Sequence, residues 1–405
     1  MLSYINPTDI QALISPFDKS EDSAILSHYL HKDNRQESEA LRGRVEAILK
    51  RRQITEKQVL SEPSSPFRSL HTLFGSTGEV PFSIDKTPNF TFIDLFAGIG
   101  GFRIACQNLG GRCVYSSEID VNAKCTYYHN FGDVPFGDIT RESVQAMIPS
   151  RFDLLCAGFP CQAFSIAGYQ RGFEDARGTL FFEIAKITKA HRPKVLLLEN
   201  VKNLMKHDKG NTFRVIQKTL EDLDYRVHYK ILNAMDYADI PQNRERIFIV
   251  AVDKRRFGNL TEFEFPDKMT LTHTIHDCID YSVSEDRYFY NADKMSHYDK
   301  LKQEIKSPDS IYQWRRQYVR ENKSNVCPTL TANMGTGGHN VPLILTPDGI
   351  RKLTPKECLR FQGYPADFEF PSYISISAKY KQAGNSVVVP LIQRICQSIV
   401  DQILA

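Results

Sequence analysis

The sequence shows little imbalance of charge and lacks the usual marks of a secreted or membrane protein. Its 51 Lys and Arg residues against 48 Asp and Glu give a net charge of only +3, which permits a polyanionic partner without indicating one. Nine cysteines occur without a C-x-x-C pair, so we expect reduced thiols rather than a disulfide framework. No basic N-terminal region precedes an apolar run, and no apolar stretch approaches the roughly 20 residues that span a bilayer. These absences predict a cytoplasmic protein with no membrane partner.

Before residue 91 the sequence predicts a helical N-terminal extension over 1–60 and a linker over 61–90. Apolar side chains between Glu37 and Gln53 fall on one face of a helix, whose other face is mostly basic. A solvated charged face explains that basic side better than contact with phosphates. A second short helix is expected from Gln53 to Leu60. Residues 61–90 are rich in Pro, Gly and Ser, which is typical of a linker.

From residue 91 to 255 the sequence alternates between strand and helix patterns, which predicts an α/β domain. A glycine turn, 97–101, follows the first strand, and Glu118 ends the second strand 20 positions after Gly98. This layout is typical of folds that bind a nucleoside-bearing cofactor, with glycines for close approach and the acid for ribose hydroxyls. The spacing G-x-G-G differs from G-x-G-x-x-G, which disfavours a nicotinamide-dependent oxidoreductase. The side chain of Asp138 is placed to accept a hydrogen bond from the edge of a nucleoside base. An equally plausible alternative is that Asp138 caps the N-terminus of a helix.

A cysteine and a carboxylate follow two neighbouring predicted strands. Strand Leu154–Ala157 runs into a Gly-Phe-Pro turn that presents Cys161, a suitable position for a nucleophile. A buried structural cysteine is the alternative. The apolar strand 194–200 carries Glu199 near its end, at the edge where open α/β sheets bind ligands. Arg244 and Arg246 then fall on one side of the entrance to a later strand.

Residues 256–350 lose the alternating pattern and contain many aromatic residues and isolated glycines. Basic side chains concentrate in Trp314–Arg320, and Thr329–His339 is a polar loop with three glycines. Basic and aromatic side chains beside an adaptable polar loop suit contact with nucleic acid, with a plain surface loop as the alternative. Two histidines and a cysteine within 273–278 could suggest a zinc site. No second pair of ligand residues follows at the spacing of such sites, so we expect no metal site.

Six motifs in series resemble the ordered motif set of DNA (cytosine-5)-methyltransferases. They are Asp94–Gly101, Gly158–Gln162, Glu199–Val201, Gln242–Arg246, Arg351–Pro365 and Gly384–Ser386. The resemblance covers about residues 90–405. It implies an α/β, Rossmann-like S-adenosylmethionine-dependent methyltransferase fold with a catalytic cofactor-binding domain, a small target-recognition domain over 256–379 and a C-terminal helix, 380–405, that returns to the catalytic domain. The N-terminal extension lies outside it.

The resemblance also implies roles for single residues. Cys161 would be the nucleophile, Glu199 and Arg246 would hold the cytosine, and Arg244 would support them. Glu118 would hold the ribose and Asp138 the adenine of S-adenosylmethionine. The implied cofactor-binding residues are Phe96, Gly98, Gly100, Gly101, Glu118, Ile119, Asp138, Ile139, Pro160, Asn385 and Ser386. The candidate DNA-binding residues are Gln162, Ser165, Arg315, Arg316, Thr329, Thr331 and Gly337.

The expected activity is methylation of C5 of a flipped-out cytosine in a specific double-stranded DNA sequence. The loop from Gln162 to Gly178 would close over the base. We expect a monomer that protects DNA in a restriction-modification system, alongside a cognate restriction endonuclease. A tRNA cytosine-5 methyltransferase is the nearest alternative, and a non-catalytic DNA-binding regulator acting through the N-terminal helices is another.

Overall fold

The computed structural model describes most of the chain, with gaps. The described residues are 13–18, 20–30, 35–51, 82, 88–160, 180–258, 262–293, 295–315, 317–335 and 341–404. The second short helix predicted at Gln53–Leu60 and most of the linker predicted at 61–90 lie outside them. Among the described residues, two helices precede the first strand, α2 (Asp22–Leu30) and α3 (Arg35–Arg51), and α3 corresponds to the amphipathic helix expected from Glu37 to Gln53.

A six-stranded sheet forms the centre of the larger part of the molecule. Its spatial order is β2-β1-β3-β4-β7-β5. The strands are β1 (Phe90–Leu95), β2 (Gly111–Ser117), β3 (Leu154–Gly158), β4 (Val195–Val201), β5 (Tyr225–Asn233) and β7 (Glu245–Asp253). The strands predicted at Leu154–Ala157 and 194–200 agree with β3 and β4 to within one residue at each end, since their apolar runs and flanking turn residues are local signals.

The first four strands of this sheet are parallel, and β7 is antiparallel to both β4 and β5. The chain goes from β1 outward to β2 at one edge, then returns to place β3 on the other side of β1. Strand order therefore reverses between β1 and β3, and ligands of open α/β sheets bind beyond the carboxyl ends of strands at such a point. The glycine turn after β1 and the Gly-Phe-Pro turn after β3 both lie there.

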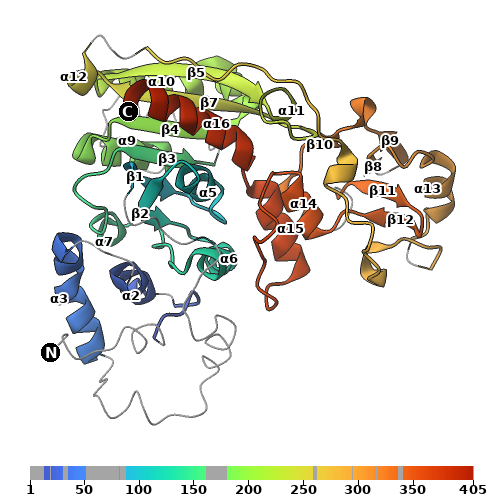
Figure 1. Cartoon of the computed structure of the whole chain (residues 1–405), viewed down its shortest axis with the longest axis horizontal. Coiled ribbons are helices and arrows are strands. Elements are labelled where there is room, and N and C mark those ends of the chain that lie inside the picture. The colour runs from blue at the N-terminus through green and yellow to red at the C-terminus, as the bar shows by residue number, and fades with distance from the viewer. Residues whose placement is uncertain are drawn as a thin grey trace.

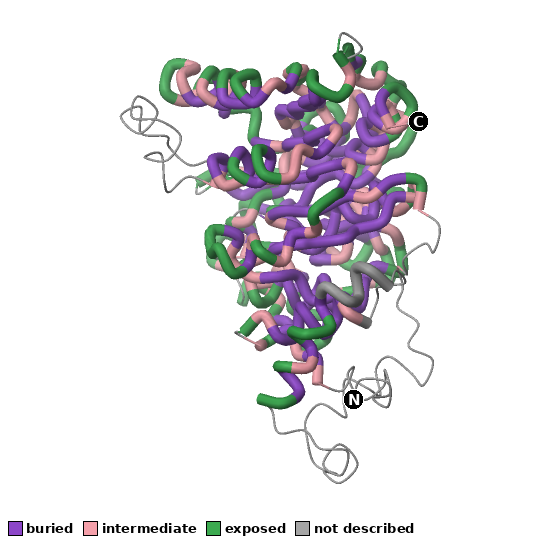
Figure 2. Tube along the Cα trace, turned by 90° about the vertical axis from the view of Figure 1, so that its left-hand side faces the viewer, coloured by how far each residue is buried: buried purple, intermediate pink, exposed green. Residues whose placement is uncertain are grey.

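Helices cover both faces of the sheet, so its inner strands are mostly buried, while the edge strand β5 is partly exposed (Figure 1; Figure 2). Successive residues of β3, such as Leu154 and Leu155, belong to different buried clusters because successive strand side chains point to opposite faces. The helices between the strands are α5 (Gly101–Gln107), α6 (Val121–Phe131), α7 (Glu142–Gln145), α9 (Leu180–His191), α10 (Asn211–Asp222), α11 (Ala234–Tyr237) and α12 (Lys254–Phe257). The mixed α/β architecture expected from the sequence is confirmed.

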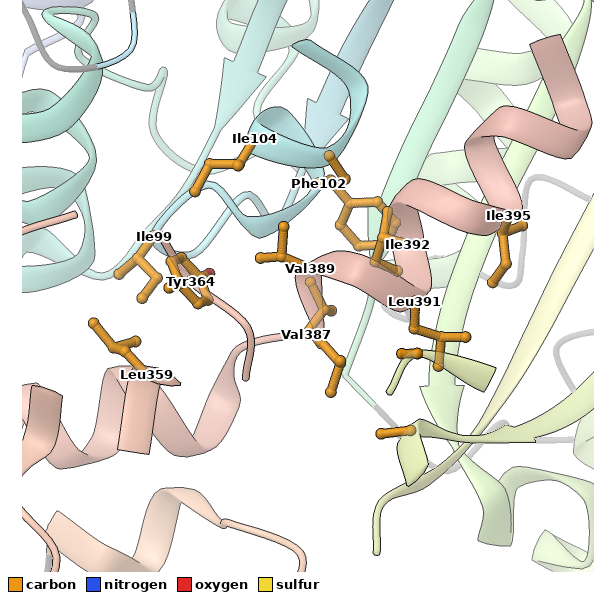
Figure 3. Close-up of a cluster of buried hydrophobic side chains, with 14 of the residues drawn as sticks. Ile99, Phe102, Ile104, Leu359, Tyr364, Val387, Val389, Leu391, Ile392 and Ile395 are labelled. Carbon is orange, nitrogen blue, oxygen red and sulfur yellow. The ribbon is translucent and has the colours of Figure 1, made fainter. Parts of the chain in front are cut away.

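The C-terminal part of the chain returns to the central sheet. Helix α16 (Val389–Ile399) follows α15 (Ile376–Asn385), and its Ile392 and Ile395 lie in one apolar cluster with Phe102 of α5 (Figure 3). By length and composition alone, Ile376–Leu404 would be apolar enough to cross a membrane, which the sequence reading did not expect. Its α16 segment is instead a core helix, since its apolar face is buried against the sheet and α5.

A second, antiparallel sheet of four strands lies apart from the first (Figure 1). Its order is β12-β11-β8-β9, from β8 (Tyr312–Arg315), β9 (Tyr318–Glu321), β11 (Leu343–Thr346) and β12 (Gly349–Lys352). Leu301 of helix α13 (Tyr298–Glu304) packs with Tyr312, Trp314 and Ile350 in a separate small core. This sheet falls within the predicted target-recognition domain.

Several contacts join the small sheet to the larger part. Strand β10 (Cys327–Pro328) pairs in parallel with β6 (Gln242–Asn243), just before β7. Arg351 of β12 forms a buried ion pair with Glu357 of α14 (Pro355–Arg360), with Nη2 2.7 Å from Oε1. Apolar residues between 263 and 288 also belong to the core cluster of the central sheet. The boundary of the recognition domain at residue 256 stays a prediction.

Candidate active site

A cavity of about 420 Å³ opens beyond the carboxyl ends of the parallel strands. Its walls come from the turn after β1, the residues after β2, the stretch Gly137–Ile139, the ends of β3 and β4, and the segment from α15 to Val387. Segments from distant parts of the sequence therefore meet at the point where the strand order reverses. Nearly all the described residues that the sequence suggested for a cofactor lie on these walls.

The turn after β1 contains three residues in the left-handed backbone region, two of them glycines. Gly98 and Gly100 have φ values of 54° and 89°, in the left-handed region, and Phe96 adopts a φ of 57° as well. A side chain at Gly100 would begin 2.3 Å from the ring of Phe131, and one at Gly101 would begin 2.6 Å from Val387. The glycines thus bring α5 close to its neighbours while leaving the backbone of the turn open to the cavity.

Glu118 lies at the floor of this cavity and is held by backbone donors. Its Oε2 accepts a hydrogen bond of 2.8 Å from Gly98 N–H, and its Oε1 accepts one of 2.7 Å from Asp120 N–H. Burial raises the pKa of Glu118 above its ordinary value, against these hydrogen bonds, which lower it. A carboxylate fixed in this way keeps free lone pairs that can accept hydrogen bonds from ribose hydroxyl groups.

The stretch after β2 supplies the residues expected around a base. Ile119 is 70% exposed and lines the cavity together with Asp138 and the buried Ile139. Asp138 Oδ1 accepts hydrogen bonds of 3.0 Å from Thr140 N–H and 2.8 Å from Thr140 Oγ1. The N-cap of α7 is Arg141, so the alternative reading of Asp138 as a helix N-cap is wrong.

The end of α15 closes the opposite wall with Asn385 and Ser386. A side chain at Gly384 would begin 2.2 Å from the main-chain carbon and oxygen of Thr331, so this residue must be glycine for α15 to approach that loop. Ser386 Oγ is hydrogen-bonded to the hydroxyl of Tyr364. Asn385 is exposed and faces the cavity, where its amide can bind a ligand.

The turn after β3 enters the cavity at Pro160, which is exposed there. Phe159 is buried, and its carbonyl accepts a 2.8 Å hydrogen bond from Asn200 Nδ2 on β4. Cys161 follows directly, but it lies outside the described residues, as do Gln162 and Ser165. The structure therefore describes the turn that leads to Cys161 as far as Pro160.

Glu199 and Arg246 form an ion pair at the edge of the cavity. Arg246 Nε lies 3.0 Å from Glu199 Oε1, and both side chains are mostly buried. Glu199 pairs with Gly158 in the sheet, so the carboxylate lies beside the strand end from which the turn to Cys161 begins. A carboxyl and a guanidinium fixed together can bind a ring that offers adjacent nitrogen and oxygen atoms.

Arg244 has different partners from Arg246, although only one residue separates them. Its Nη1 donates to the carbonyl of Leu330 at 2.8 Å, and its Nη2 donates to that of Ser386 at 2.6 Å. Burial lowers the pKa of this guanidinium to about 9, and the neighbouring charge of Arg246 acts in the same direction. Arg244 therefore fastens two loops beside the cavity, while its distal nitrogens are occupied by main-chain oxygens.

Comparison with known proteins identifies the architecture and its chemistry. The family model of the C-5 cytosine-specific DNA methylases matches residues 90–401. The chain belongs to this family. It is therefore a DNA cytosine-5 methyltransferase with the α/β methyltransferase fold, as the six motifs indicated. The residues before 90, with α2 and α3, lie outside the match.

Similar proteins include several type II methyltransferases. M.Bsp6I of Bacillus sp. (strain RFL6) is 52% identical over 313 residues, which cover 76% of this chain and 98% of that protein. M.HpaII of Haemophilus parainfluenzae is 42% identical over 342 residues, covering 80% and 93% respectively. M.HhaI of Haemophilus parahaemolyticus is 42% identical over 322 residues, covering 76% and 93%.

Solved structures share the fold at lower identity. The crystal structure of the Schizosaccharomyces pombe (S. pombe) Dnmt2 methyltransferase aligns with a TM-score of 0.58 and 18% identity, covering 77% of this chain and 98% of that one. A putative DNA modification methyltransferase encoded within an E. coli prophage aligns with a TM-score of 0.54 and 21% identity, covering 77% and 99%. These likenesses concern the fold of the methyltransferase.

The candidate DNA-binding residues of this methyltransferase separate into two groups. Arg315 is exposed at the hairpin between β8 and β9, where it pairs with Tyr318, which is 56% exposed. Thr329 and Thr331 lie instead beside the catalytic core: Thr329 Oγ1 donates to Asn243 O at 2.7 Å, and the backbone of Thr331 contacts Gly384. Arg316 and Gly337 lie outside the described residues.

Sequence reasoning gave no role to some residues that build the methyltransferase site. Asn200 holds the turn before Cys161, and a polar residue inside an otherwise apolar strand was the available signal. Gln242 is fully buried; its Oε1 accepts from Leu330 N–H at 3.2 Å. Lys381 bridges to Asp120 with Nζ 2.7 Å from Oδ2, and no local pattern indicates that pair.

The histidines near residue 275 have other partners in the part of the chain that the structure describes. His273 Nδ1 lies 2.9 Å from Asp239 Oδ2, and His276 Nε2 lies 2.9 Å from Asp309 Oδ1. Cys278 is buried in the core. Within those residues, no group of three His, Cys, Asp or Glu side chains is arranged to hold a metal ion.

Proposed function

We propose that this chain transfers a methyl group from S-adenosylmethionine to C5 of a cytosine flipped out of a specific double-stranded DNA sequence, through a covalent bond between Cys161 and C6. The observation that carries the proposal is the Glu199–Arg246 pair beside Gly158, at the strand end that leads to Cys161. We further propose that it acts as a monomer in the cytoplasm, as the modification enzyme of a restriction-modification system with a cognate endonuclease.

The cavity fits S-adenosylmethionine by the chemistry of its walls. Glu118 offers a carboxylate for the ribose hydroxyls, and Asp138 and Ile119 lie where an adenine ring would bind. Ser117, Gln382 and Asn385 add further polar residues to the same walls. The bound cofactor would supply an electrophilic methyl group on sulfur.

The proposed chemistry begins with the attack of the Cys161 thiolate on C6. A new S–C6 bond forms, and the electrons of the C5–C6 double bond move into the ring, which makes C5 nucleophilic. Glu199 in its protonated form would donate a hydrogen bond at N3, and Arg246 would bind O2, where negative charge develops. After methylation, loss of the C5 proton and cleavage of the S–C6 bond restore the aromatic ring and free the thiolate.

The target atoms are inaccessible in stacked DNA, so the base must leave the duplex. Flipping costs a few kcal/mol, and contacts with the flipped base offset this cost. We assign sequence recognition to residues 256–379, because the hairpin with Arg315 and Tyr318 offers a charge for phosphates and an exposed ring. A tRNA substrate is the alternative; the family match to DNA methylases favours DNA.

Trapping with 5-fluorocytosine tests the proposed mechanism. Fluorine at C5 cannot leave as a proton, so the enzyme should remain covalently bound to a duplex that carries the analogue at its target site. We expect a denaturation-resistant protein–DNA adduct that requires S-adenosylmethionine and is absent for Cys161→Ser. Parallel assays with DNA and tRNA decide the substrate. An active wild-type enzyme that forms no adduct contradicts the covalent route.

A further inference from the structure

The N-terminal helices, which lie outside the family match, pack directly on the methyltransferase domain. Ile25 and Leu26 of α2, the helix beside β2 and α6 in Figure 1, are buried in the same cluster as Phe136 and Ile139. Helix α3 is held on α2 by its apolar face and by an ion pair in which Arg51 Nη2 lies 2.5 Å from Asp22 Oδ1. The contact therefore reaches the segment just before Asp138 in the cavity wall.

That segment, 133–137, lies between the edge strand β2 and helix α2. On the β2 side, Phe136 N–H donates to Ser116 O at 2.9 Å, and Phe136 O accepts from Glu118 N–H at 2.8 Å. On the α2 side, Val134 N–H donates to Ser27 Oγ at 3.0 Å, and Gly137 N–H donates to Glu21 Oε2 at 2.9 Å. The extension thus satisfies two backbone donors that β2 does not reach.

Side-chain packing holds the same segment in place. The ring of Phe136 stacks on Tyr115 with centroids 4.9 Å apart, and His28 of α2 contacts it with centroids 4.8 Å apart. At Gly137 an added side chain would begin 2.7 Å from Glu21 Oε1, and its three nearest atoms all belong to Glu21. Gly137 itself lines the cavity, so the side chain of Glu21 packs against the outer side of the cavity wall.

The extension also contacts the segment that leads into α15. The ring of Phe17 lies 5.6 Å from that of Tyr373, in the segment just before α15. Helix α15 carries Lys381, whose ion pair with Asp120 joins the two walls. The N-terminal segment therefore touches structures that lead to both sides of the cavity.

We propose that the N-terminal extension positions the cofactor-contacting stretch Gly137–Ile139, with Glu21 and Ser27 as positioning residues, and so sets the affinity for S-adenosylmethionine. This proposal rests on the proposed cofactor site. The hydrogen bond from Gly137 N–H fixes the residue adjacent to Asp138, whose carboxylate is aimed at the adenine. Without Glu21 the segment keeps its contacts with β2 and with Ser27 of α2 but loses the hydrogen bond from Gly137 N–H.

Calorimetric titration of the full-length chain with S-adenosylmethionine tests the proposal, together with steady-state kinetics on DNA. Glu21→Ala should raise Kd and KM for the cofactor by about three- to tenfold, with kcat at saturating cofactor unchanged; this is less than the full effect of losing a hydrogen bond to a charged acceptor, because Glu21 does not touch the cofactor itself. Glu21→Gln keeps an acceptor oxygen and should recover most of the affinity. Glu46→Ala removes a carboxylate of α3 whose ion-pair partner, among the described residues, is Arg42 of the same helix, and it should match the wild type.

The outcomes separate this inference from the proposed function. If the wild type does not bind S-adenosylmethionine, the proposed cofactor site is wrong. If the wild type binds and Glu21→Ala binds equally well, the positioning role is wrong while the cofactor site stands. A loss of kcat and melting temperature in both Glu21→Ala and Glu21→Gln, without a specific change in KM, also contradicts positioning.

Hydrogen exchange gives a second readout that does not depend on turnover. In Glu21→Ala the backbone amides of residues 133–139 should exchange faster than in the wild type, while amides of β4 keep their protection. Ser27→Ala, which removes the acceptor for Val134 N–H, should accelerate exchange in the same segment. Unchanged exchange in both variants would overturn the proposal.

Discussion

Arg246 Nε lies 3.0 Å from Glu199 Oε1, across the antiparallel junction of β4 and β7. Both side chains are at most 15% exposed, so the carboxyl group is held at a fixed place rather than left to move in solvent. This contact is possible because β7 lies antiparallel beside β4, so the beginning of β7 lies next to the end of β4. Arg246, at the beginning of β7, is therefore close to Glu199, near the end of β4.

Replacement of Glu199 should affect the chemical step. We expect Glu199→Gln to slow single-turnover methyl transfer by about two to four orders of magnitude, because the amide cannot donate a proton toward N3 as a carboxylic acid can. Cofactor and DNA affinity should change little. Rapid-quench measurement with excess enzyme checks the rate, and an unchanged rate would remove Glu199 from this role.

Replacement of Arg244 should affect stability as well as activity. Its guanidinium is 3% exposed and donates to the carbonyls of Leu330 and Ser386. Arg244→Leu leaves these acceptors unpaired in a buried place and should lower the free energy of unfolding by about 2–4 kcal/mol. Urea denaturation measures this loss. Arg226→Gln, which breaks an exposed ion pair with Glu262, should change stability by less than about 1 kcal/mol.

Two glycines in helices should respond to alanine in opposite ways. A side chain at Gly384 would begin 2.2 Å from the backbone of Thr331, so Gly384→Ala should force α15 away from the loop and weaken cofactor binding with a loss of about 1–3 kcal/mol in stability. Gly43 of α3 has no atom within 4 Å of such a position. Gly43→Ala should therefore raise stability by about 0.5–1 kcal/mol. Thermal unfolding of both variants checks the contrast.

Arg315 should contribute to DNA binding through charge. The residue is exposed at the β8–β9 hairpin, and a contact with phosphate would add to the salt dependence of binding. Arg315→Gln should weaken binding across all sequences and reduce the slope of log K against log salt by about 1. Lys218→Gln on α10 is the matched control, since its ammonium pairs with Asp222 on the same helix. Equal slopes for the two variants would exclude a phosphate contact by Arg315.

Cofactor affinity should depend on pH through Glu118. Burial raises the pKa of this carboxyl group, so it takes up a proton at a higher pH than an ordinary glutamate. Only the ionised form has both oxygens free to accept from ribose hydroxyls. Affinity should therefore be full above the raised pKa and fall as the pH decreases through it. Titrations of wild type and Glu118→Gln across this range should show the dependence in the former and a weak, flat affinity in the latter.

Much of the fold could be predicted because its signals are local. The apolar runs of β1 and β4, the glycine turn from 97 to 101 and the acid at Glu118 each depend on residues within one or two turns of chain. Their order along the chain also indicated the family, since each motif supplies one part of the same reaction. For these features the sequence by itself determined what the structure contains.

Tertiary packing decided the features that join distant segments. Arg244 and Arg246 have the same period-two pattern, yet one binds main-chain carbonyls and the other binds Glu199, because the loops at 330 and 386 reach only Arg244. Thr329, whose contact with DNA stays a prediction, donates a hydrogen bond to Asn243 O, 86 positions earlier in the chain. The N-terminal helices looked like an appendage, yet Glu21 reaches Gly137 beside the cavity. Such contacts depend on which surfaces pack together when the chain folds. Patterns within a short segment therefore cannot predict them.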